Sequence, residues 1–165
     1  MASGFVTVYR SLPARFPSID VIGSITQAAE RRNASLGVSS VLVYSRQANY
    51  HLLEGSERSL SLIYEHVRHD PRHEIQWKRS GRISGSPLLP DLPLGLLDAD
   101  NECAHAWRGI DTVSAQAGTL DDITALIALI LRLTLAKYSA SAAAQIVRRL
   151  RLNPADTSVE EAVSG

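Results

Sequence analysis

The chain has 165 residues, of which 45% are hydrophobic and 21% are charged, as in an ordinary globular protein. Its 17 basic residues balance its 17 acidic residues, so net charge gives no reason to expect binding to nucleic acid or to an acidic membrane. Cys103 is the single cysteine, which excludes an internal disulfide and any four-cysteine metal site. The N-terminus lacks the pattern of a signal peptide, and the most apolar run, residues 125–136, is short and interrupted by Arg132. We therefore expect a soluble, cytoplasmic protein with no membrane span.

The first 55 residues predict three strands and one helix. Residues 5–9 alternate in the manner of a strand, which the prolines that follow should end. Apolar residues at three- and four-residue spacing predict a helix over residues 19–32, capped by Ser18. Residues 38–44 and 50–53 read as two strands joined by a polar turn, which predicts a hairpin.

A second helix and a fourth strand should follow. Ser56 is placed to cap a helix with one apolar face, and Asp70-Pro71 should stop it. Residues 75–83 predict a strand whose lysine and arginines suit the edge of a sheet. The order β-α-β-β-α-β predicts an α+β, ferredoxin-like fold, with an antiparallel sheet and two helices on one face.

The rest of the chain should cover the other face of this sheet. Residues 86–106 are rich in proline, leucine and aspartate and show no clear periodicity. Thr119 can cap a strongly apolar helix over Leu120–Tyr138, and a second short helix is expected over residues 142–152. A helix that is apolar nearly all round must be buried on several sides, by core, by the following helix or by a second subunit. We expect the second subunit, and hence a homodimer or higher homo-oligomer.

Five short motifs occur in a fixed order in the first half of the chain. They are Tyr9-Arg10-Ser11, Asn33, Gly37-Val38-Ser39-Ser40, Leu53-Glu54-Gly55 and the turn Arg68–His73. In this order and at these spacings the sequence resembles the BLUF family, flavin-binding sensors of blue light, over about residues 5–95. The resemblance implies a BLUF-like domain over residues 1–100, with a helical extension over 101–152 and a tail over 153–165.

The resemblance also implies a cofactor and the residues that would hold it. An FAD isoalloxazine ring would lie between the two helices. Ile25 would touch the ring, Asn33 would hydrogen-bond its carbonyl edge, and Tyr9 would donate its phenol to the switching residue. The complete implied set is Tyr9, Ile25, Asn33, His51, Arg72 and His73.

The sequence departs from the family at the switch. Three residues before Glu54-Gly55 the family carries a glutamine, and this chain carries His51. A side-chain amide can exchange donor for acceptor by rotation or tautomerisation, whereas imidazole is a rigid ring of different reach. Leu92-Pro93-Leu94-Gly95 likewise replaces the family's W-x-M-G pattern. We therefore expect a sensory or regulatory protein that acts through an unidentified protein partner, without normal blue-light switching and with FAD held weakly if at all; the alternative is an FAD photoreceptor with altered photochemistry.

Simpler interpretations of these residues stay open. Tyr9 can be an ordinary strand tyrosine, and Asn33 can close the first helix because asparagine tolerates a left-handed backbone. His66, His69 and His73 suggest a zinc site, but they run off a helix end with few carboxylates nearby, so no metal is expected.

Two further functions are weighed on the sequence. Arg148, Arg149 and Arg151 cluster on the last expected helix, where a solvated face is favoured over DNA contact. The ferredoxin-like fold also occurs in acylphosphatases, but residues 10–15 contain no glycine that would let backbone amides converge on an anion. With no other catalytic motif present, no enzyme activity is expected.

Overall fold

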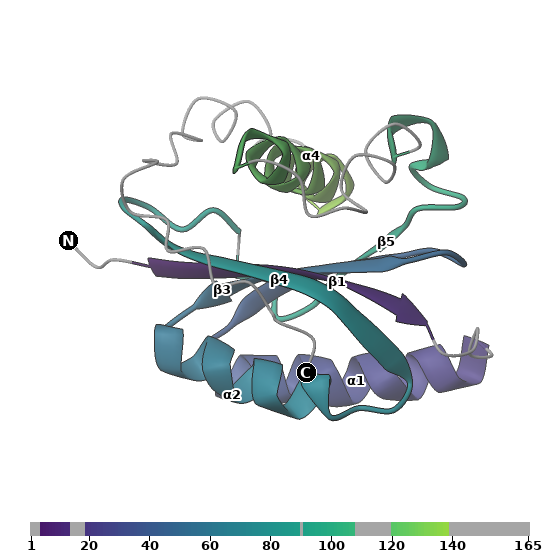
Figure 1. The fold of residues 1–165 in the computed structure, drawn as a ribbon, viewed down its shortest axis with the longest axis horizontal. Helices are drawn as coiled ribbons and strands as arrows, with labels where there is room; N and C mark the ends of the chain where they lie inside the picture. Colours follow the sequence, from purple (N-terminus) through teal and green to yellow (C-terminus); the bar gives the residue numbers. More distant parts are fainter. Residues whose placement is uncertain (1–3, 14–18, 90, 108–119, 139–165) are drawn as a thin grey trace.

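The structure is a computed structural model that describes residues 4–13, 19–89, 91–107 and 120–138. Its central layer is a five-stranded sheet with the strand order β4-β1-β3-β2-β5 (Figure 1). The strands are β1 (Gly4–Pro13), β2 (Ser39–Tyr44), β3 (Asn49–Gly55), β4 (His73–Ile83) and β5 (Gly95–Asp98). The first four pair antiparallel, with β4 at one edge, which confirms the predicted ferredoxin-like sheet and its edge strand.

Helices cover both faces of this sheet. α1 (Ile19–Ser35) and α2 (Glu57–Arg68) lie on one face, and α4 (Leu120–Tyr138) lies on the other (Figure 1). The predicted cap of α2 is confirmed, since the Ser59 backbone N–H donates to Ser56 Oγ at 3.1 Å. None of the described helices is long and apolar enough to cross a membrane. The expected caps Ser18 and Thr119, the expected helix over 142–152 and the expected tail lie outside the described residues.

The fifth strand, β5, lies within residues 86–106, the segment whose sequence shows no clear periodicity. β5 pairs in parallel with β2, from Val41 opposite Gly95 to Tyr44 opposite Asp98. Side chains of α4 hold its other edge, because Tyr138 Oη accepts from the Leu96 backbone N–H at 2.9 Å and Lys137 Nζ donates to the Leu96 carbonyl at 2.8 Å. A four-residue strand shows too little alternation to be recognised from sequence.

The main core lies between the sheet and α4. Tyr50 sits in it, with its ring centroid 5.2 Å from that of Trp107 and 6.2 Å from that of Trp77. The apolar residues of α4 belong to the same core, and Leu129 is only 5% exposed. The apolar stripe of this helix is therefore buried within one chain. The expected homodimer stays a prediction, but this stripe is not available as the contact between its subunits.

The opposite face of the sheet carries a smaller core. Its buried members come from β1, β3, α2 and the residue just before β2. They are Tyr9, Val38, Leu53, Leu60 and Ile63. Among the described residues, α1 contributes none of them. The inner side of α1 consequently faces a cavity in place of close-packed side chains.

Candidate functional site

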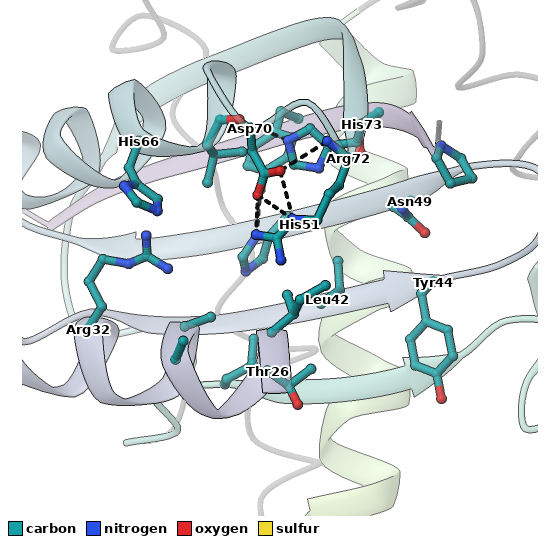
Figure 2. A pocket seen from close by; sticks show the side chains of 18 of the residues that line it. Thr26, Arg32, Leu42, Tyr44, Asn49, His51, His66, Asp70, Arg72 and His73 are labelled. Carbon is teal, nitrogen blue, oxygen red and sulfur yellow. Dashed lines mark hydrogen bonds and ion pairs between the residues drawn. The ribbon is translucent and has the colours of Figure 1, made fainter. Parts of the chain in front are cut away.

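A cavity of about 540 Å³ lies between α1 and α2, against the sheet (Figure 2). This volume falls within the range of about 300–1,000 Å³ that is usual for small-molecule sites. Five of the six residues singled out from the sequence line it, from four different elements and the turn after α2: Tyr9, Ile25, His51, Arg72 and His73. The fold thus brings together side chains that are up to 64 positions apart in the sequence.

Asn33 is the sixth residue, and it is not among those that line the cavity. Its side chain is 1% exposed and donates both amide hydrogens within the protein, to Ser40 Oγ at 2.9 Å and to the Pro93 carbonyl at 2.8 Å. Neither hydrogen is free for the flavin carbonyl expected from the sequence. In this structure Asn33 ties the end of α1 to β2 and to the segment that leads into β5.

Arg32, the preceding residue, occupies the cavity wall in its place. Figure 2 shows its guanidinium projecting from α1 into the cavity, toward the side where His51 and His66 lie. Its Nε is buried and has no hydrogen-bond partner within residues 4–13, 19–89, 91–107 and 120–138. Sequence reasoning missed Arg32, although helical periodicity could have found it, because Ile25, Ala29 and Arg32 recur at the spacing of one helix face.

Tyr9 and His51 form a buried pair at the sheet end of the cavity. They are direct partners across β1 and β3, and Tyr9 Oη lies 2.7 Å from His51 Nδ1. Burial raises the pKa of the Tyr9 phenol, so it stays protonated. Burial, with smaller contributions from His73 and Arg32, lowers the pKa of His51 to about 3, so its ring is neutral at ordinary pH.

The hydrogen bond between these two residues fixes the tautomer of His51. If Tyr9 donates to Nδ1, the phenol proton is satisfied and the ring proton sits on Nε2. The reverse direction would leave the phenol proton without an acceptor, so it forfeits one buried hydrogen bond. Nε2 is buried and has no hydrogen-bond partner among the residues that the structure describes. The cavity wall therefore presents an unsatisfied N–H from His51.

The turn after α2 closes the cavity with a paired charge. Arg72 Nε donates to both carboxylate oxygens of Asp70, at 2.7 and 2.9 Å, and Arg72 Nη2 also contacts Asp70. Hydrogen bonding from Arg72 lowers the pKa of Asp70 to about 2. His73 Nε2 donates to the Val67 carbonyl at 2.9 Å. Arg72 and Asp70 thus neutralise each other, whereas the side chain of Arg32 meets no carboxylate among the described residues.

His66, His69 and His73, at and around the end of α2, do not converge on a metal position. His69 Nδ1 lies 2.7 Å from the Glu65 carbonyl, and the Nε2 of His73 is already bonded to Val67. Within the described part of the chain, no group of three histidine, cysteine, aspartate or glutamate residues is arranged to hold a metal ion. The structure thus gives the zinc interpretation no support there.

Comparison with known proteins identifies the class of this domain. Residues 5–80 match the family BLUF, sensors of blue-light using FAD. The fold is similar to BlrB, a BLUF protein in its dark state, with a TM-score of 0.61 and 18% identity over 79% of this chain and 97% of that one. It is also similar to BlsA in its photo-activated state, with a TM-score of 0.62 and 17% identity over 78% and 94% of the two chains. Residues 5–80 therefore form a BLUF domain.

Larger signalling proteins contain similar domains. A bacterial light-regulated adenylyl cyclase matches with a TM-score of 0.59 and 17% identity, over 78% of this chain and 39% of that chain. A stretch of 53 residues is 32% identical to the photoactivated adenylate cyclase subunit beta-like protein FB of Euglena gracilis, which is 32% of this chain and 6% of that protein. The chain thus spans only a small part of this curated relative. At such identities the structural likeness establishes the fold alone.

Proposed function

We propose that this BLUF domain is a sensory or regulatory module that binds FAD in the cavity, has lost the normal blue-light switch and acts through a protein partner. The Tyr9–His51 pair is the observation that carries the proposal. It occupies the place where the family carries a tyrosine and a switching glutamine, and it is held by a buried hydrogen bond of 2.7 Å.

Flavin fits the side chains that the cavity presents. The isoalloxazine ring carries two carbonyl oxygens and ring nitrogens that accept hydrogen bonds. The wall offers the buried N–H groups of Arg32 and His51, which have no acceptor among the described residues. Ile25 and Ala29 supply apolar surface from α1. When bound, FAD would supply the light-absorbing group, and Tyr9, Ile25, Arg32, His51, Arg72 and His73 are the residues proposed to surround it.

The loss of switching follows from the chemistry of His51. An amide can turn over in place and present a donor where it had presented an acceptor. The imidazole accepts from Tyr9 at Nδ1, so it keeps its proton on Nε2 and always presents a donor to the cavity. Turning the ring over would break the bond to Tyr9, which costs about 1 kcal/mol or more in a buried site. His51 can therefore occupy the site without storing a light-driven change.

FAD is expected to bind weakly. Asn33 donates both amide hydrogens to Ser40 and Pro93, so neither is available to the flavin. The loss of one good hydrogen bond lowers the affinity for FAD by about tenfold. The test is the absorption spectrum of the purified protein before and after extensive dialysis, with affinity then measured by titration of FAD. Retention of stoichiometric FAD through dialysis would contradict weak binding, and failure to bind added FAD at any concentration would contradict the flavin proposal itself.

An FAD photoreceptor with altered photochemistry is the second candidate. Tyr9 favours it, because a buried, protonated phenol at the cavity wall can still give an electron and a proton to an excited flavin. A reversible light-induced change in the spectrum of the FAD-bound protein would select this candidate. DNA binding is less favoured, and the arginines that would support it lie outside the described residues.

A further inference from the structure

The cavity wall presents two buried hydrogen-bond donors that have no partner in the described part of the chain. One is the Nε–H of Arg32, and the other is the Nε2–H of His51, whose side chain is only 7% exposed. Leaving a buried donor unpaired costs about 1–3 kcal/mol, so each donor favours a ligand that brings an acceptor. The two donors come from α1 and β3, on different sides of the same cavity (Figure 2).

The wall of the cavity also carries an excess of positive charge. Asp70 is the one carboxylate among the described lining residues, and it is bound by Arg72. Tyr9 and His51 are both neutral. The guanidinium of Arg32 therefore keeps an uncompensated positive charge beside the cavity, within the part of the chain that the structure describes. A site of this kind favours a ligand that is electron-rich, and favours an anion over the corresponding neutral molecule.

We infer that Arg32 makes the site selective for the reduced, anionic form of the flavin over the oxidised form. The inference rests on the proposed function, namely that the cavity binds FAD. Reduction adds two electrons and one proton to neutral oxidised isoalloxazine and gives a singly charged anion. A fixed cation near the ring is one of the means by which proteins tune flavin electronics. The affinity of the site for FAD would then depend on the redox state of the flavin.

Arg32 acts here as a binding residue whose charge, and not only its hydrogen bond, is required. An opposite charge within about 4–6 Å shifts an ionisation equilibrium by about 1–3 pKa units, so we expect reduced FAD to bind at least about tenfold more tightly than oxidised FAD. Binding and reduction form a closed cycle. A tenfold preference therefore raises the two-electron midpoint potential of bound FAD above that of free FAD by about 30 mV.

The experiment titrates the full chain with oxidised FAD in air and with dithionite-reduced FAD under anaerobic conditions, and measures the midpoint potential of the bound flavin. Arg32→Gln keeps a side-chain N–H but removes the charge, and should bring the affinity ratio close to one. Arg32→Lys keeps the charge and should retain most of the preference. Arg31→Gln is the matched control, because Arg31 is exposed on the same helix and does not line the cavity.

The outcomes separate this inference from the proposed function. Equal binding of both forms by the wild type would overturn the inference and leave the flavin proposal standing. A preference for reduced FAD that survives in Arg32→Gln would overturn the role of Arg32. Binding of neither form would overturn both. Circular dichroism of each variant establishes that it is folded before its affinities are compared.

Discussion

The hydroxyl of Tyr9 lies 2.7 Å from Nδ1 of His51, and the two residues face each other directly across β1 and β3. This hydrogen bond joins a phenol that stays protonated to an imidazole that stays neutral. Each group holds the other in a single arrangement. The first two predictions follow from this pair.

With FAD reconstituted, the wild-type protein should show no persistent red-shifted flavin spectrum after blue illumination, whereas His51→Gln should show one. Glutamine restores a side chain that can exchange donor for acceptor beside Tyr9. The measurement is the difference spectrum before and after illumination, followed by its recovery in the dark. Adding Tyr9→Phe to His51→Gln should abolish the shift. A reversible shift in the wild type would show that another group does the switching.

Acidification should destabilise the wild type more than it destabilises His51→Gln. The pKa of His51 is about 3 in the folded state and close to its ordinary value of about 6.5 in the unfolded chain, so the unfolded state binds the extra proton. The contribution is fully present above about pH 6.5 and is lost as the pH falls toward 3. Between pH 7 and pH 5 we expect about 2 kcal/mol of extra loss in the wild type, measured as the free energy of unfolding in urea. Parallel pH profiles for the two proteins would contradict it.

Asn33→Ala should lower the free energy of unfolding by about 2–3 kcal/mol, because it removes both hydrogen bonds of a buried side chain, to Ser40 and to Pro93. Gln27→Ala, at an exposed position on the same helix, should change it by less than about 0.5 kcal/mol. Urea denaturation of the flavin-free proteins measures both. An Asn33→Ala protein that is as stable as the wild type but no longer binds FAD would show that Asn33 contacts the ligand directly.

Leu129→Glu should unfold or aggregate the protein and should not yield a folded monomer. Leu129 is buried in the core between α4 and the sheet, so the substitution places a charge in an apolar environment, at a cost above about 3 kcal/mol. Arg132→Glu, at an exposed position of α4, serves as the control and should remain folded. Size-exclusion chromatography with circular dichroism distinguishes the outcomes. Folded, monomeric Leu129→Glu from a dimeric wild type would instead place the stripe in a subunit contact.

The sequence predicted the elements whose periodicity is strong and local. The four antiparallel strands and the helices α1, α2 and α4 show clear apolar patterns, and the Ser56 side chain caps the start of α2. β5 escaped prediction because four residues carry little pattern and their pairing with β2, some 50 positions away, is not local. Such pairing depends on the finished sheet.

The sequence motifs predicted where the candidate site lies, but not which residue at the end of α1 faces it. The family resemblance linked Tyr9 to the position of His51, and in the structure the two residues are direct partners across β1 and β3. At the end of α1 the motif pointed to Asn33. In the structure, the side chain of Arg32 lines the cavity, whereas the side chain of Asn33 is hydrogen-bonded inside the protein. Adjacent helix residues differ by about 100° in direction, so a shift of one position changes which of them meets a ligand.

The contacts of Tyr138 and Lys137 with Leu96 also determine how this sheet ends. β5 is an edge strand, and an exposed edge offers unpaired backbone groups to which a strand of another molecule can add. At Leu96 both the N–H and the carbonyl are already bonded to side chains of α4. The end of this helix thus occupies the backbone positions that an incoming strand would need, and it protects the edge against intermolecular sheet growth there.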